Sequence, residues 1–282
     1  MRIAKSHFPI HTLAIVINQG KAGALQLGEA LAKMSQSLGI ATQIYSSYPL
    51  TKGFLKNKDL CIVLGGDGTL LGVVPEAIDK QVPVLGVNQG KLGFLATFGE
   101  DLLANFKAVL KGAFCVDHRS VLSCTTADNE RYLSLNDIVI KSHHVTDMVQ
   151  IELALKEKGV VKPLVEYACD GLLICTPTGS TAYNLSAGGP IVHPGAKIIT
   201  VTPICPHTLS NRSLVFDHSA EFCVSFKSTK GSAAHVTLDG RLIQASDNLL
   251  PLHIGIAQES FPLIVPLGYE PFKTLSNKLR WG

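Results

Sequence analysis

The chain has 282 residues, of which 46% are hydrophobic and 17% charged, and its 25 basic and 22 acidic side chains leave a net charge of +3. This composition supports a large packed core and excludes wholesale disorder, while so small a net charge argues against nucleic acid or a membrane surface as a partner. No apolar run approaches the ~20 residues that cross a bilayer, so we expect a cytoplasmic protein.

Short apolar strands alternate with helical patterns over the first third of the chain. Residues 60–64 are apolar at every position, which is typical of a strand covered on both faces. This alternation predicts an N-terminal doubly wound α/β domain with a parallel sheet, over residues 1–112. The expected strands are residues 13–18, 41–45, 60–64 and 82–87, and the expected helices are residues 21–38, 69–80 and 101–112.

Strand patterns separated by turn residues dominate the chain after residue 112. They predict a β-rich, sandwich-like second domain over residues 113–267, with one short helix near residues 181–188. The tail at 268–282 is too short for a domain, and we expect it to pack back on the first domain. The expected strands are residues 131–141, 148–155, 171–176, 198–202, 221–226, 234–238 and 263–265.

The strongest chemical signal directly follows the apolar strand at 60–64. The turn Gly65-Gly66-Asp67-Gly68-Thr69 leads into a helix, and in a parallel sheet such a turn lies at the carboxyl end of a strand, where ligands bind. Glycines let backbone N–H groups approach a phosphate closely, and a helix N-terminus favours negative charge. A carboxylate costs energy in such a loop unless it holds Mg²⁺ or takes a proton from an attacking hydroxyl. The alternative is a tight turn in which Asp67 caps the helix.

Two familiar phosphate-binding motifs do not fit the sequence. Gly86 and Gly90 are separated by three residues, whereas a Walker A motif needs four. The dinucleotide fingerprint fails as well, because the glycine after Gly66 and Gly68 is Gly72, one residue too late. An ordinary P-loop ATPase and an ordinary Rossmann dehydrogenase are therefore not supported.

Two further polar segments lie in the β-rich half. Residues 176–190 are dense in Ser, Thr and Gly, and their hydroxyls suit sugar hydroxyls and base edges, while Tyr183 offers a ring for stacking. Asn136-Asp137 interrupts what is otherwise a strand. An ordinary Ser/Thr-rich loop and a simple turn or bulge are the alternatives for these two segments.

Taken together, these motifs resemble those of the NAD kinase family. Residues 65–68 match its GGDG motif, Asn136-Asp137 matches its Asn-Glu/Asp motif, and residues 170–190 resemble its long Gly/Ser/Thr-rich signature. Residues 87–95 and 203–210 also look like family segments. GGDG alone is shared with lipid kinases and phosphofructokinases, but all the motifs in this order are highly specific.

The resemblance implies an enzyme that transfers the γ-phosphoryl group of ATP, or of a similar donor, to the 2′-hydroxyl of the adenosine ribose of NAD. Asp67 would be the general base. The donor would carry Mg²⁺ or another divalent cation itself, because no metal site built from a side-chain cluster is indicated. The phosphate loop would comprise Gly65, Gly66, Gly68 and Thr69. The substrate-binding residues would be Gly68, Asn136, Asp137, Asp170, Thr181, Ala182, Tyr183, Asn184, Leu185 and Ser186.

The family is oligomeric, so the resemblance also implies a homo-oligomer, most simply a tetramer, with NAD bound between the two domains. Ala168 and Arg241 depart from the residues that many members carry, which leaves the phosphoryl donor and the preference between NAD and NADH open. One alternative is a lipid kinase of the diacylglycerol or sphingosine type, although the polar residues 178–186 offer no apolar opening for an acyl chain. The other is a non-catalytic dinucleotide sensor, which would have no use for Asp67.

Overall fold

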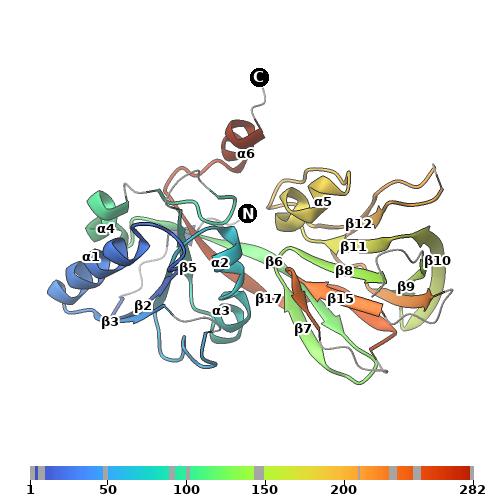
Figure 1. Ribbon diagram of the computed structural model, residues 1–282, viewed down its shortest axis with the longest axis horizontal. Coiled ribbons are helices and arrows are strands. Elements are labelled where there is room, and N and C mark those ends of the chain that lie inside the picture. The colour runs from blue at the N-terminus through green and yellow to red at the C-terminus, as the bar shows by residue number, and fades with distance from the viewer. Residues whose placement is uncertain are drawn as a thin grey trace. The chain divides into compact units, whose positions relative to one another are not determined.

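The computed structural model describes residues 4–5, 10–46, 50–88, 93–99, 102–142, 149–208, 210–228, 234–243 and 249–279 (Figure 1). Residues named above at positions 89–92, 101, 148, 209 and 280–282 lie outside this description. The chain divides into two compact units, which we name unit 1 (Met1–Arg119 with Ser260–Gly282) and unit 2 (Ser120–Glu259). These limits differ from the expected ones because two long strands, β6 (Cys115–Thr125) and β17 (Leu252–Val265), run from one unit into the other.

Unit 1 is an α/β unit. Its elements are β1 (Ala4–Lys5), β2 (Thr12–Ile17), α1 (Ala24–Ser37), β3 (Ala41–Tyr45), β4 (Leu60–Leu64), α2 (Asp67–Leu71), α3 (Val74–Lys80), β5 (Val84–Val87), α4 (Leu102–Leu110) and α6 (Pro271–Leu279). The parallel sheet has the order β3-β2-β4-β5-β17, and β1 pairs antiparallel with β6. Helices α1 and α4 pack on one face, and Figure 1 shows α2 and α3 on the other side of the strands. The expected doubly wound α/β fold is confirmed, and it explains why β4 is buried at every position.

Unit 2 consists almost entirely of strands. Its elements are β7 (Arg131–Ser134), β8 (Asp137–Ser142), β9 (Val149–Glu157), β10 (Val160–Cys169), β11 (Gly171–Cys175), η1 (Thr178–Thr181), α5 (Tyr183–Ser186), β12 (Ile198–Ile204), β13 (Leu214–Asp217), β14 (Phe222–Ser228), β15 (Ala234–Leu238) and β16 (Arg241–Leu242). One antiparallel sheet has the order β13-β12-β11-β8-β15-β16, and a second layer runs β10-β9-β14-β17. A single core cluster draws side chains from both layers, so the expected sandwich-like domain is confirmed.

Some of the expected elements are wrong in detail. The helix expected over residues 69–80 is two helices, α2 and α3, because Pro75 has no N–H to donate and cannot continue the hydrogen-bond ladder of α2. The strand expected over residues 131–141 is likewise two strands, β7 and β8, with Leu135 and Asn136 between them. Both errors come from breaks that apolar periodicity alone does not register.

The sequence pattern also misses β6, β10, β13 and β16 and most of β17. Strand β6 was missed because the polar run Asp117-His118-Arg119 interrupts its apolar pattern. In the structure, Asp117 and Arg119 form a buried ion pair, with Arg119 Nε 2.8 Å from Asp117 Oδ2. Strand β10 is exposed over its first half and contains Pro163, which the ladder accommodates with a register shift before Val165. A buried charge pair and an exposed edge strand both violate the alternation by which strands are found.

Candidate active site

The Gly-rich turn of unit 1 lies at the carboxyl edge of the parallel sheet. It follows β4, and the Gly65 N–H donates to the carbonyl of Val87 at the end of β5, at 3.0 Å. A Cβ placed on Gly66 or Gly68 would meet nothing within 4 Å, so the backbone of the turn is open on that side. An open glycine backbone at this edge can bind a phosphate through its N–H groups.

The Asp67 carboxylate is held by the backbone of a neighbouring segment. Its Oδ2 accepts a hydrogen bond from the N–H of Phe94 at 2.9 Å, and its Oδ1 accepts from the N–H groups of Leu95 (3.1 Å) and Ala96 (3.0 Å). A Cβ at Gly93 would collide with Oδ1, so only glycine leaves room for this arrangement. A carboxylate has about four acceptor positions, so the three bonds from described residues leave one position on Oδ2 for a further donor. The N-cap residue of α2 is Gly66, and no side chain that the structure describes caps this helix. Asp67 therefore does not act as the helix cap.

Thr69 packs against the Gly-rich turn. It is buried, its side chain lies where a Cβ on Gly65 would be, and its hydroxyl accepts a hydrogen bond from Asn18 Nδ2 at 2.9 Å. The Thr69 side chain therefore packs against Gly65, and its hydroxyl is engaged by Asn18. Asn18 was not singled out from the sequence, although its position directly after the first strand, at the same sheet edge, is the signal that could have found it.

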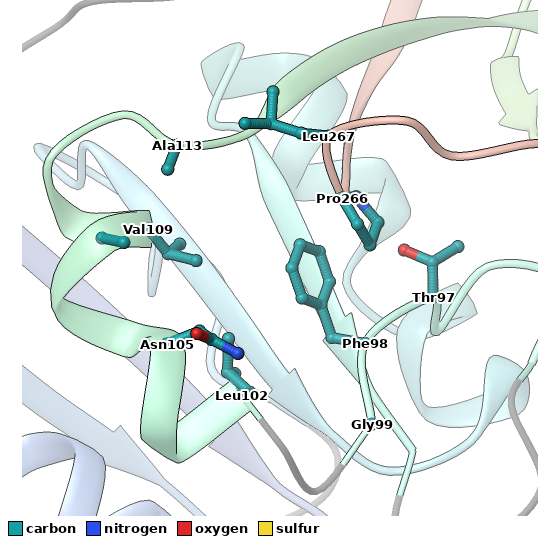
Figure 2. Close-up of a pocket in the computed structure, with 10 residues that line it drawn as sticks. Thr97, Phe98, Gly99, Leu102, Asn105, Val109, Ala113, Pro266 and Leu267 are labelled. Atoms are coloured by element: carbon teal, nitrogen blue, oxygen red, sulfur yellow. The ribbon is translucent and has the colours of Figure 1, made fainter.

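A separate cavity of about 400 Å³ lies in unit 1 between α4 and the residues after β17 (Figure 2). Phe98, Leu102, Val109 and Pro266 give it a mainly apolar lining, and Asn105 is its largest polar group. None of the described lining side chains is titratable, so these residues offer neither a base nor a cation for group transfer.

In unit 2, polar groups gather around Asn136 and Asp137. Oδ1 of Asp239 accepts hydrogen bonds from the N–H groups of Asn136 (2.7 Å) and Asp137 (3.3 Å). Oδ1 also accepts from the Ser134 hydroxyl at 2.7 Å, and Oδ2 accepts from the Leu135 N–H at 2.9 Å. A single buried carboxylate thus fixes the whole turn between β7 and β8. Sequence reasoning missed Asp239, because a partner more than 100 residues away leaves no local pattern.

A cation and an aromatic ring lie near Asp137. Lys141 follows four residues later on β8, so the two side chains point to the same face of the sheet. The Lys141 amine donates to the Tyr183 hydroxyl at 3.2 Å and lies 4.9 Å from the centre of its ring. Burial and repulsion by Asp239 raise the pKa of Asp137 to about 7, whereas Lys141 lowers it. Lys141 was also missed, and the period-two spacing from Asp137 is the signal that could have found it.

We expect Asp137→Asn to remove a pH dependence of stability. Besides Asp239 and Lys141, the Cys175 thiol faces the Asp137 carboxyl. Because the folded pKa of about 7 lies above the ordinary value of 3.8, this group's contribution to stability is complete below about pH 4 and is lost as the pH rises through 7. The difference in Tm between Asp137→Asn and the parent should therefore grow in favour of the variant from pH 5 to pH 8. Asp170→Asn, at an exposed carboxylate, is the control, and a difference independent of pH would contradict the prediction.

The segment after β11 packs closely on Asn136. The Thr176 N–H donates to the Asn136 carbonyl at 2.9 Å, and the Thr176 hydroxyl donates to the Leu135 carbonyl at 2.6 Å. A Cβ at Gly179 would collide with the Asn136 carbonyl oxygen, so glycine allows η1 to approach the turn. The structure thus brings the start of the Ser/Thr-rich segment and the Asn136-Asp137 pair together.

The predicted substrate-binding residues of this segment divide into two groups. Asn184 is fully buried, and its amide donates to the Pro190 carbonyl at 3.0 Å and accepts from the Thr202 hydroxyl at 2.8 Å. Its side chain therefore ties the segment to β12. The residues that keep part of their surface exposed are Thr181, Ala182, Tyr183, Leu185 and Ser186.

Asp170 joins β10 to β11 and has an exposed side chain. The next residue, Gly171, pairs directly with Lys141 in the ladder between β11 and β8. Asp170 therefore lies one residue from the strand position opposite Lys141, whose amine contacts Tyr183.

Within the described residues, no group of three or more His, Cys, Asp or Glu side chains could hold a metal ion. In the same part of the chain, no helix is long and apolar enough to cross a membrane.

Comparison with known proteins connects the motifs of both units. A model of the ATP-NAD kinase N-terminal domain matches residues 49–115, and a model of the ATP-NAD kinase C-terminal domain matches residues 135–250. The NAD kinase of Syntrophotalea carbinolica is 38% identical over 257 residues, which cover 89% of this chain and 86% of that protein. The chain belongs to the NAD kinase family.

A second NAD kinase, from Ralstonia nicotianae, is 35% identical over an alignment that covers 99% of this chain and 95% of that protein. Among solved structures, yeast NADH kinase in complex with NADH has a TM-score of 0.79 at 24% identity and covers 98% of this chain and 89% of that one, which shows a shared fold. The GGDG turn falls within the N-terminal match and Asn136-Asp137 within the C-terminal match. Neither the lipid kinase nor the sensor alternative finds support.

Proposed function

We propose that this NAD kinase family member transfers the γ-phosphoryl group of ATP to the 2′-hydroxyl of the adenosine ribose of NAD and so forms NADP and ADP. The observation that carries the proposal is the Asp67 carboxylate, which three backbone N–H groups hold beside the open Gly66 and Gly68, and which accepts no fourth bond from the residues that the structure describes. A lone base in a phosphate-binding turn is what transfer to an alcohol requires.

In the proposed reaction, a ribose hydroxyl is too weak a nucleophile at neutral pH without a base. Asp67 Oδ2 accepts the hydroxyl proton as the oxygen forms its bond to the γ-phosphorus and the bond to the ADP oxygen breaks. The amides of Phe94, Leu95 and Ala96 hold the carboxylate in one orientation throughout. Asp67 therefore needs no reorganisation when the proton moves.

Recognition of the dinucleotide is assigned to unit 2. Asn136 and Asp137 would bind the adenosine half, and their turn is preorganised by Asp239 and Thr176. Tyr183 is exposed and offers a ring for stacking. The exposed positions at Thr181, Ala182, Leu185 and Ser186 would complete this surface, with Asn184 supporting it from inside.

A divalent cation fits this site only if the phosphates of the donor bind it. Three described N–H groups already occupy Asp67, so it can provide at most one ligand, and the phosphates must provide most of the others. When bound, Mg²⁺ would neutralise part of the negative charge on the phosphates. Chelation of divalent cations should accordingly abolish turnover without changing the thermal unfolding of the chain.

The test is an assay of the purified chain with ATP, MgCl₂ and NAD, followed by chromatographic identification of NADP. Parallel reactions with polyphosphate as donor, and with NADH, adenosine or diacylglycerol as acceptor, define the specificity. Formation of NADP, with little turnover of adenosine or lipid, supports the proposal. Equal turnover of diacylglycerol, or tight NAD binding without product, would overturn it.

We also propose a homotetramer and, from the sequence alone, a cytoplasmic location. An exposed apolar surface on β10 supports assembly: Val160, Val161 and Leu164 are 57%, 46% and 44% exposed on a strand at the edge of its layer. Edges and apolar patches of this kind are commonly covered by symmetric pairing.

We expect light scattering to give a mass of about four chains for the parent protein, and a smaller mass for Leu164→Glu, because a charge on an apolar contact surface opposes association. Lys162→Glu reverses a charge on the same strand and serves as the control. A parent protein of about 30 kDa that keeps full activity at nanomolar concentration would contradict the tetramer.

A further inference from the structure

The C-terminal helix α6 belongs to unit 1 and packs on it through Leu275. Leu275 is buried, and just before the helix Tyr269 lies next to the buried ion pair of Asp117 and Arg119. Burial raises the pKa of Tyr269, while the neighbouring Arg119 guanidinium and Thr274 hydroxyl lower it, so the phenol is enclosed by the chain's own groups. Leu275 and Tyr269 therefore hold the helix and the segment before it against unit 1.

Its last turn presents a cation beside the Asp67 site. Lys278 lies three residues after Leu275, hence on the same side of α6. Its ammonium nitrogen is 4.1 Å from the centre of the Phe94 ring, and the N–H of Phe94 is one of the three that hold Asp67. Lys278 is thus separated from the Asp67 carboxylate, which we assign as the base, by a single residue, Phe94.

The charge on Lys278 is only partly compensated. Desolvation lowers the pKa of its ammonium group, and attraction to Asp67 raises it. Among the described residues, its ammonium forms no salt bridge with a carboxylate, yet the side chain is accessible to solvent. A cation that only stabilised the fold would be expected to have an acidic partner, whereas a cation for a ligand must keep its donors free.

Resting on the proposed function, we propose that Lys278 is a phosphate-binding residue of the donor site and that its ammonium contacts the terminal phosphates of ATP next to the Gly-rich turn. Phosphoryl transfer depends chiefly on positioning and charge neutralisation, so a lysine at this place has a direct use. It also offsets the repulsion between the donor's phosphates and the Asp67 carboxylate. The ring of Phe94 holds the ammonium through a cation–π contact until the donor arrives.

The test measures the binding of Mg-ATP by calorimetry without NAD, together with kcat and KM for both substrates. Lys278→Gln should weaken Mg-ATP binding and kcat/KM for ATP by about 10- to 100-fold, since it removes one charge-assisted contact. KM for NAD should change less than about twofold. Lys278→Arg should recover most of the binding, and Lys273→Gln, at an exposed lysine of the same helix, should behave as the parent.

Three results would overturn the inference. Unchanged Mg-ATP binding in Lys278→Gln excludes a contact with the donor. A fall in kcat alone, with Mg-ATP binding intact, means that Lys278 acts only by supporting Phe94. A larger effect on NAD than on ATP assigns the lysine to the other substrate's phosphates. Failure of the parent enzyme to form NADP would instead contradict the proposed function.

Discussion

Asp67→Asn is expected to lower kcat by about 10²–10⁴-fold and to leave NAD binding within a few fold of the parent, because the variant loses the base but not the shape of the site. The asparagine oxygen can still accept the N–H groups of Leu95 and Ala96. Its NH₂ group faces the Phe94 N–H instead of accepting it, and it cannot take a proton from the ribose hydroxyl. The effect should therefore appear in kcat, measured by steady-state kinetics, with NAD binding measured by calorimetry.

Asp59→Asn is the matched control. Asp59 also accepts backbone N–H groups, from His11 and Thr12, but it lies before β4 at the opposite edge of the sheet. Its loss should lower Tm and leave kcat nearly unchanged. Gly93→Ala keeps the Asp67 carboxylate but crowds its Oδ1, so an intermediate loss of kcat is expected. If Asp67→Asn keeps more than half of the activity, Asp67 is not the base.

Asp239→Asn is expected to raise KM for NAD by about 10- to 100-fold, with a smaller effect on kcat. The carboxylate accepts four hydrogen bonds that fix the turn bearing Asn136 and Asp137, and an amide cannot accept all four. The loss should fall on substrate binding, because the turn belongs to the surface assigned to the dinucleotide and not to the group that takes the proton.

A pH profile separates this positioning role from a general loss of stability. Asp239 is one of the two causes that raise the pKa of Asp137 to about 7, so Asp239→Asn should move any inflection in the NAD KM near pH 7 to lower pH. Asp217→Asn, at a carboxylate that accepts from Ser219 in an exposed turn, should leave both KM and the profile unchanged. A parent-like KM for NAD in folded Asp239→Asn would refute the positioning role.

The features that the sequence determined are those encoded over short stretches. Alternation of apolar strands and helices revealed the doubly wound unit, because each strand and helix carries its own periodicity. The GGDG turn, the Asn136-Asp137 pair and the Ser/Thr-rich segment were visible as uninterrupted motifs, and their order sufficed to indicate the family. Their residue types alone indicated phosphate, base and sugar chemistry.

The features that only the tertiary structure decided are contacts between distant parts of the chain. Asp67 meets amides 27 to 29 residues away, and Asp239 holds a turn more than 100 residues earlier. Lys278 reaches Phe94 only because the chain returns to unit 1 through β17. The physical reason is the same in each case. A charged side chain is stabilised by whichever polar or aromatic groups the fold brings to it, and the local sequence around one partner does not identify the other.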